Sequence, residues 1–131
     1  MSITLSAATR ALLDGRNYAA LATLNPDGSP QTSVVWVTRD GDDLLISTLR
    51  DRAKARNLAR DPRASVSVWS SDDEERYAEI RGTVTITEDV GRAVTNALAH
   101  KYHGRDFPPD APGHVRVVLR LTPEKVTGNA A

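Results

Sequence analysis

The pattern of hydrophobic and polar positions along this chain predicts a mainly β protein. Apolar and polar residues alternate over several short segments, as they do in strands that bury one face. In one such segment Val66 and Val68 alternate with Ser65 and Ser67. The alternation predicts six strands, at residues 18–24, 31–38, 43–48, 64–69, 76–87 and 115–121.

Turn-forming residues separate the first three of these strands. Asn25–Gly28 reads NPDG, in which proline presets one backbone angle and glycine accepts the left-handed one. A second tight turn at 40–42 leads to the third strand, so residues 18–48 should form an antiparallel meander. Gly82 predicts a bulge or a close backbone approach within a strand, and Pro123 is expected to end the last strand.

Three helices are expected between these strands, at residues 6–14, 52–60 and 90–102. Ser6, Asp51 and Asp89 are the predicted N-caps, because short polar side chains can accept hydrogen bonds from the first turn. Pro62 should end the second helix, since the residue before proline is pushed out of the helical region.

Six strands with short turns and inserted helices indicate a six-stranded antiparallel barrel that forms a single domain over residues 1–131. Closure removes the exposed strand edges of an open sheet. A barrel this small fills its interior with side chains. A sizeable ligand should therefore bind outside the barrel or at a subunit junction, which favours a homodimer with interfacial sites.

Composition excludes several classes of protein. The formal net charge is zero, which argues against a general nucleic-acid-binding domain. No cysteine is present, so neither a disulfide nor a thiolate nucleophile can form. No signal peptide or membrane-spanning run is evident, and we expect a soluble cytoplasmic protein.

Positive charge is concentrated in residues 49–63, LRDRAKARNLARDPR. A helix that begins beside Arg52 and Lys54 would offer free backbone N–H groups and a partial positive charge, which suits a phosphate. On charge alone, a solvated helix face explains the segment equally well. The setting favours a phosphate site, because the preceding strand ends in two hydroxyl residues, Ser47 and Thr48.

Metal and hydrolase chemistry have weaker support in the sequence. His100 and His103 are about one helical turn apart, but no third ligand follows at a recognisable spacing. We expect no metal site. No Gly-x-Ser-x-Gly elbow, dinucleotide-binding glycine motif or P-loop occurs.

A phosphate-bearing redox cofactor requires less of the side chains, because the cofactor carries the reactivity. Ser47, Thr48, Arg52 and Lys54 could hold its phosphate, and residues 33–36 could border its ring. Trp36 and Trp69 could cover ring faces, although tryptophan more often packs in a core or an interface.

The run RAKARNLARDPRASVSV at residues 52–68, preceded by NPDGSPQ at 25–31, resembles the flavin/deazaflavin-dependent oxidoreductases related to pyridoxamine 5′-phosphate oxidase. The segments at 77–87, 101–104 and 116–128 are similar to the branch that uses the deazaflavin coenzyme F-420. The resemblance covers nearly the whole chain in the same order. It implies an FMN-binding type of split β-barrel, present as a homodimer with cofactor sites at the interface.

The resemblance also implies a set of cofactor-binding residues. Arg52 and Lys54 match the Arg-x-Lys pair that holds the phosphate, and Asn57 matches a residue near it. The full set of expected cofactor-binding residues is Gln31, Ser33, Val34, Val35, Trp36, Ser47, Thr48, Arg52, Lys54 and Asn57.

The implied activity is hydride transfer between coenzyme F-420 and a small organic acceptor. FMN is the alternative cofactor, and an F-420-binding or carrier protein without turnover is the alternative function. Arg50 and Arg56 could favour the acidic tail of F-420, or be solvated arginines. Tyr77 and Arg81 are candidate donors on the substrate side, and no catalytic acid is identified.

Overall fold

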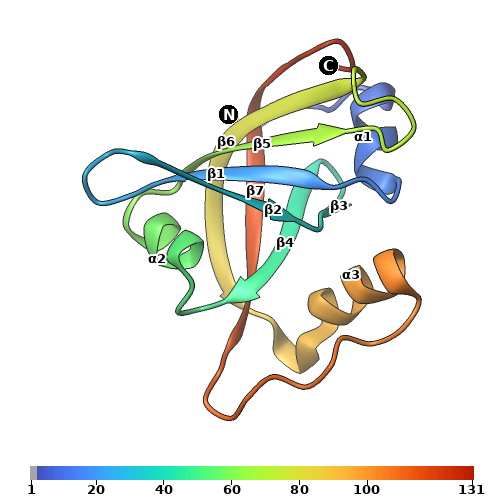
Figure 1. The fold of residues 1–131 in the computed structure, drawn as a ribbon. Helices are drawn as coiled ribbons and strands as arrows, with labels where there is room; N and C mark the ends of the chain where they lie inside the picture. The colour runs from blue at the N-terminus through green and yellow to red at the C-terminus, as the bar shows by residue number, and fades with distance from the viewer. Residues whose placement is uncertain (1–2) are drawn as a thin grey trace.

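The computed structural model describes residues 3–131, which build one curled antiparallel sheet with three α-helices around it (Figure 1). Seven strands pair in the order β2-β1-β5-β6-β7-β4-β3. The strands are β1 (Ala19–Leu24), β2 (Pro30–Val35), β3 (Thr38–Asp40), β4 (Asp43–Leu49), β5 (Arg63–Trp69), β6 (Tyr77–Glu88) and β7 (Arg116–Thr127). The helices are α1 (Ala7–Asp14), α2 (Ala53–Arg60) and α3 (Ala93–His103), and a 3₁₀ turn, η1 (Val90–Arg92), precedes α3.

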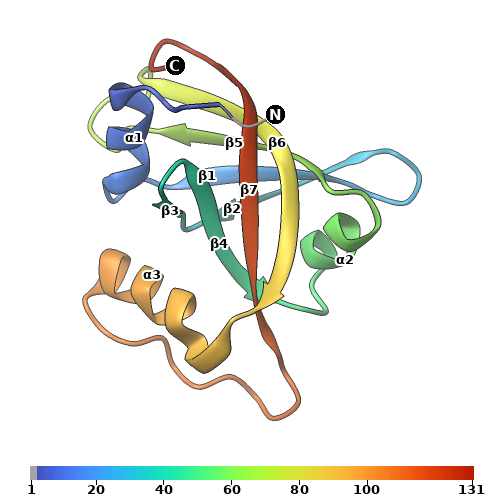
Figure 2. The ribbon, with the colours of Figure 1, turned by 180° about the vertical axis from the view of Figure 1, so that it is seen from behind.

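The two edges of this sheet are joined by only two residues. β2 and β3 are the outermost strands, yet only Trp36 and Val37 separate them in the sequence. Because so short a connection spans roughly 10 Å, the sheet must curl until its edges lie close together. Figures 1 and 2 show β1, β2 and β5 crossing β4, β6 and β7. The edges do not pair with each other, so the fold is a split β-barrel, as predicted.

The predicted strand at residues 31–38 is wrong in one respect, because it is two strands on opposite edges. The backbone of Val37 turns away from the sheet toward α3. Its N–H donates to the Tyr102 hydroxyl at 3.2 Å, and its carbonyl accepts from the Lys101 ammonium at 2.6 Å. These contacts replace strand pairing at the break, and they explain why the sheet has seven strands and not six.

Strand β7 continues past Pro123, where the sequence predicted its end. Pro123 lies opposite Gly82, next to a register shift between Arg81 and Gly82. A β-bulge is a position where a strand tolerates proline. A Cβ atom on Gly82 would lie 2.0 Å from the Thr122 carbonyl oxygen. Gly82 is therefore both a bulge and a close approach, as predicted.

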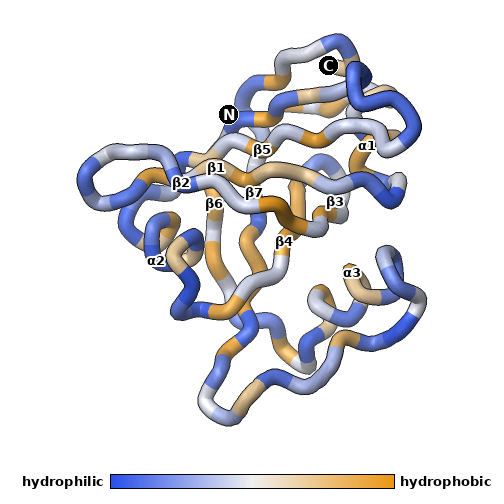
Figure 3. The backbone as a smooth tube through the Cα atoms, viewed as in Figure 1, coloured by the Kyte–Doolittle hydropathy of each residue, from blue (hydrophilic) through white to orange (hydrophobic). Residues whose placement is uncertain are grey.

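The interior of the barrel is filled by aliphatic side chains from every long strand, in agreement with the alternating pattern. Figure 3 shows hydrophobic and polar positions succeeding one another along the strands. Val66 and Val68 are fully buried, while Ser65 and Ser67 between them are partly exposed. Ile80 and Leu119 are also buried. A filled interior leaves the outside of the barrel for ligands.

The predicted N-caps fare differently. Ser6 is confirmed, since its hydroxyl accepts the Thr9 N–H at 3.1 Å. The Asp89 carboxylate accepts two N–H groups of the first turn of α3, but Asp89 is the N-cap of η1, and Arg92 is the N-cap of α3, which starts at Ala93. Asp51 is wrong: the N-cap of α2 is Arg52, which makes no side-chain capping bond. Asp51 lies one residue too early, in a turn that the Arg52 N–H closes on the Leu49 carbonyl at 3.1 Å.

Candidate functional site

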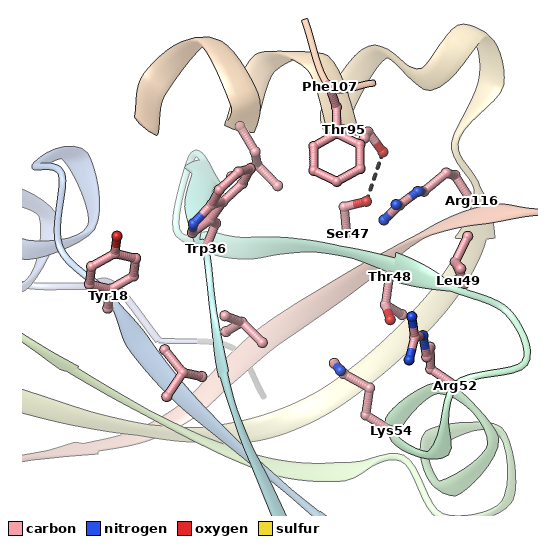
Figure 4. Close-up of a pocket in the computed structure, with 13 residues that line it drawn as sticks. Tyr18, Trp36, Ser47, Thr48, Leu49, Arg52, Lys54, Thr95, Phe107 and Arg116 are labelled. Atoms are coloured by element: carbon pink, nitrogen blue, oxygen red, sulfur yellow. Dashed lines mark hydrogen bonds between the residues drawn. The ribbon is translucent and has the colours of Figure 1, made fainter. Parts of the chain in front are cut away.

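A cavity of about 320 Å³ lies beside the split of the barrel, between the sheet, α2 and α3 (Figure 4). The ends of β2 and β4, the start of α2, one side of α3 and the loop before β7 contribute to its wall. Its lining residues are Tyr18, Val34, Val35, Trp36, Ser47, Thr48, Leu49, Arg52, Lys54, Thr95, Leu98, Phe107 and Arg116.

One end of this cavity is positively charged. Arg52 and Lys54 lie together beside Thr48 (Figure 4). Within residues 3–131, no carboxylate forms an ion pair with either side chain. The first turn of α2 also has no acidic side chain. Two cations at a helix start that lacks a side-chain cap form an end suited to an anion.

The pKa of Lys54 responds to this environment. Partial burial lowers the pKa below its ordinary value of 10.5, and the charge of Arg52 lowers it further. Both effects disfavour the ammonium form. A bound anion would counter them, because it favours the charged form of Lys54. An anionic ligand would therefore stabilise the charged end of the cavity.

Aromatic rings form the wall at the other end. Trp36 stacks on Tyr102 with ring centroids 5.1 Å apart and planes inclined by 8°. The Phe107 ring meets Trp36 edge-on at 6.1 Å. Such a wall offers an apolar surface to a flat ring.

A third cation at the wall is already neutralised. Arg116 binds both carboxylate oxygens of Asp110, at 2.9 and 2.8 Å, and its guanidinium lies 4.8 Å from the centroid of the Phe107 ring. This arrangement holds Phe107 and the loop before β7 against the cavity. Arg116 is thus engaged by Asp110, unlike Arg52 and Lys54.

Between the charged end and the aromatic wall lies a chain of hydrogen bonds. The hydroxyls of Ser47 and Thr95 are 2.7 Å apart, and Thr95 donates to Asp89 Oδ2 at 2.7 Å. Asp89 also accepts the backbone N–H groups of Val94 and Thr95, at 3.0 and 2.8 Å. A buried carboxylate that caps α3 therefore fixes Thr95 against Ser47.

The chain matches a known protein family over nearly its whole length. Residues 5–130 match the family described as pyridoxamine 5′-phosphate oxidase. The chain belongs to the pyridoxamine 5′-phosphate oxidase family. Its fold and family make it an oxidoreductase of the flavin/deazaflavin type.

Solved structures of similar proteins agree with this assignment. A structure described as an F420 reductase is 32% identical, with a TM-score of 0.84, and the match covers 94% of this chain and 98% of that one. A conserved hypothetical protein from Mycobacterium tuberculosis is 22% identical, with a TM-score of 0.76 and coverage of 95% and 84%. A pyridoxamine 5′-phosphate oxidase-related, FMN binding protein from Nostoc punctiforme is 19% identical, with a TM-score of 0.63 and coverage of 85% and 72%. The last two share the fold.

The structure brings most of the expected cofactor-binding residues together. Seven of them line the cavity: Val34, Val35, Trp36, Ser47, Thr48, Arg52 and Lys54. Ser47 and Thr48 do not act as one pair, however, because consecutive strand residues point in opposite directions. Figure 4 shows Ser47 directed to Thr95 and Thr48 on the side of Arg52.

Three expected residues do not line this cavity. The Asn57 amide donates to the Thr23 hydroxyl and to Asn25 Oδ1, both at 3.0 Å, and it is 4% exposed. The Gln31 amide oxygen accepts from Thr23 at 2.9 Å. These bonds join α2 to the hairpin of β1 and β2. Ser33 also lies outside, and its buried hydroxyl has no hydrogen-bond partner within residues 3–131.

Other residues singled out from the sequence lie elsewhere. Trp69 and Tyr77 pair across β5 and β6, and neither lines the cavity. Arg81 forms an ion pair with Glu79 at 2.8 Å and is also outside it.

Sequence reasoning missed the contributions of α3 and the loop that follows it. Thr95, Leu98 and Phe107 line the cavity but lie far from the basic segment along the chain. Their only sequence signal is the KYHG resemblance a few residues away, which says nothing of a hydroxyl at position 95.

Residues 3–131 contain no cluster of three or more His, Cys, Asp or Glu side chains able to hold a metal ion. None of the helices in this part of the chain combines the length and apolar character needed to cross a bilayer.

Proposed function

We propose that this protein is a reductase that transfers a hydride between coenzyme F-420 and a small organic acceptor. The observation that carries the proposal is a cavity with two unpaired cations at one end and aromatic rings at the other. The match at 32% identity to a protein described as an F420 reductase supports it.

The residues of the cavity fit a phosphate-bearing ring cofactor. Arg52 and Lys54 would bind the phosphate by charge-assisted hydrogen bonds, with the Thr48 hydroxyl beside them. β2 is an edge strand, so part of its backbone does not pair with β1 and is available to the edge of a ring. Trp36 and Phe107 would exclude water from the ring. When bound in reduced form, F-420 supplies the hydride.

Positive charge beyond the phosphate end favours F-420 over FMN. F-420 carries an acidic glutamyl tail in addition to its phosphate. Arg56 lies next to Arg52 along a second hollow that also includes His114. Arg50 has only a long and exposed ion pair with Glu88, at 3.7 Å. An exposed arginine held as weakly as Arg50 is available to a carboxylate tail. Arg56 is also exposed, and it donates to the Asp51 carbonyl.

FMN is the second candidate, because the same phosphate end and aromatic wall accommodate it. The relative described as an FMN binding protein shares the fold and supports this alternative. An F-420 carrier without turnover is the third, since no acid–base pair has been identified at the cavity.

We also propose that the active form is a homodimer with cofactor sites between the subunits. Val34 is 68% exposed and Tyr18 is 47% exposed, and both lie at the cavity. Large apolar side chains gathered at an open site are typical of a surface that a partner covers. A second copy of the chain would bury these residues and enclose the cofactor.

Two measurements in sequence test the cofactor and the activity. Fluorescence titrations of the purified protein with F-420 and with FMN should show tighter binding of F-420. The protein should then be mixed anaerobically with reduced F-420 and each of a panel of unsaturated ring compounds. Oxidation of F-420 should depend on the presence of the protein. Preference for FMN would assign the alternative cofactor, and tight F-420 binding without turnover on any acceptor would favour a carrier.

A further inference from the structure

Proton counting along the chain from Ser47 to Asp89 determines how Ser47 faces the cavity. Asp89 is held as an acceptor: Val94 N–H donates to Oδ1 and Thr95 N–H to Oδ2. Oδ2 also accepts from the Thr95 hydroxyl at 2.7 Å, and this contact uses the hydroxyl's proton.

A hydroxyl has one proton, so Thr95 has none left for Ser47. The 2.7 Å contact between the two hydroxyls then requires Ser47 to be the donor. The Ser47 proton points at Thr95, and only lone pairs of its oxygen remain for the cavity. Thr95 is 2% exposed and Asp89 is 6% exposed, so water does not compete for these bonds.

We infer that Ser47 is a hydrogen-bond acceptor in this site and recognises a donor group of the bound cofactor, with Thr95 and Asp89 as its positioning residues. The phosphate end requires hydrogen-bond donors, so Ser47 does not belong to it. The inference rests on the proposed function. It gives a cofactor-binding role to the region between the two ends of the cavity. A chain hydroxyl or a ring N–H of a flavin-type cofactor supplies such a donor.

The orientation can be tested without any cofactor. In the free protein, nuclear magnetic resonance should detect the Thr95 hydroxyl proton with a coupling through the hydrogen bond to the carboxylate carbon of Asp89. The Ser47 hydroxyl proton should lie close to Thr95. A Thr95 proton directed at Ser47 instead would overturn the inference, whatever the protein binds.

The recognition is tested by Thr95→Val, which keeps the buried shape but removes the acceptor of the Ser47 proton. Ser47 is then free to turn its proton toward the ligand. Affinity for the cofactor that the wild type prefers should fall roughly tenfold, the effect of one mismatched hydrogen bond. Thr95→Ser, which keeps the hydroxyl, should restore affinity, and thermal unfolding should show that both variants fold.

Two flavin analogues identify the donor. One has a 5-phosphopentyl chain without hydroxyls, and the other is methylated at the ring N–H. The analogue that lacks the recognised donor should bind wild type and Thr95→Val equally well. If Thr95→Val weakens the binding of both analogues as much as that of FMN, Ser47 recognises neither donor and the inference is wrong. If wild type binds neither F-420 nor FMN, the proposed cofactor fails while the orientation measured in the free protein still stands.

Discussion

At the scale of single residues, the site depends on two cations that share one small space. Arg52 is the N-cap of α2 and Lys54 lies in its first turn, and neither has an ion-pair partner among residues 3–131. Burial and Arg52 lower the pKa of Lys54. The same two effects that disfavour its charge in the free protein make an anion a favourable partner.

Affinity for the cofactor should therefore depend on pH through Lys54. A bound phosphate raises the pKa of Lys54 relative to the free protein, so binding takes up protons. Affinity should be full while Lys54 is charged and should fall as the pH rises through its lowered pKa, below 10.5. Titrations between about pH 7 and pH 10 would measure this fall.

Lys54→Arg is the matched control, because its guanidinium stays charged over that range. Titration of the ligand itself affects both proteins equally and cancels in the comparison. Identical pH profiles for wild type and Lys54→Arg would show that Lys54 does not contact the anion.

Residue reasoning from the sequence succeeded where the signal was local. The Arg-x-Lys spacing and the hydroxyls before it are visible within residues 47–54, and all four side chains line the cavity. Asn57 has the same local signal, yet its amide bonds to Thr23 and Asn25. A partner brought by the fold, more than 30 residues away, decides what such a side chain does.

At the scale of elements, α3 holds the split of the barrel in place. Its Lys101 and Tyr102 satisfy the backbone of Val37, where the chain leaves one sheet edge for the other. The Tyr102 hydroxyl also donates to the Asn17 carbonyl at 2.5 Å. The Tyr102 ring supports Trp36 at the cavity wall. The helix thus couples stability of the split to the shape of the site.

Tyr102→Phe should lower the free energy of unfolding by about 1–3 kcal/mol, since it leaves buried backbone groups of Asn17 and Val37 without a partner. The phenyl ring can still stack on Trp36. Urea unfolding would measure the change. Tyr77→Phe is the control: Tyr77 is 43% exposed, and its change should stay within about 0.5 kcal/mol. Equal free energies of unfolding for the two variants would contradict the role of α3 in stabilising the split of the barrel.

Element boundaries were predictable where polarity alternates and less so where α3 intervenes. The strands with regular alternation appear at the expected places, within a few residues. The division of residues 31–38 into two strands depends on contacts with Lys101 and Tyr102, and no residue in that segment predicts these contacts. Likewise, β7 passes Pro123 because Gly82 on its neighbour forms a bulge.

At the scale of the whole molecule, the cavity reaches the sheet edge that β2 forms. The exposed Val34 side chain on this strand contributes to the cavity wall. Our proposal of a homodimer accounts for this exposure. It also predicts that assembly and cofactor binding depend on each other, because each needs the same surface.

Val34→Glu should shift the protein toward the monomer, because a buried carboxylate without a partner disfavours association. Sedimentation analysis would give the mass of each form. Val90→Glu is the matched control, as Val90 is 78% exposed, lies away from β2 and does not line the cavity. A wild-type protein that stays monomeric at high concentration and with cofactor bound would contradict the proposed dimer.

The most direct test of the central claim is cofactor affinity in wild type and in the double variant Arg52→Ala with Lys54→Ala. The account predicts that wild type binds F-420 more tightly than FMN. The affinity of the double variant for both cofactors should be lower by roughly a hundredfold or more, since each charged contact contributes about 1.5–3 kcal/mol. Arg105→Ala with Lys125→Ala removes two exposed cations outside the cavity and should bind as wild type does. Unchanged affinity in a folded Arg52 and Lys54 double variant would contradict the phosphate site on which the account rests.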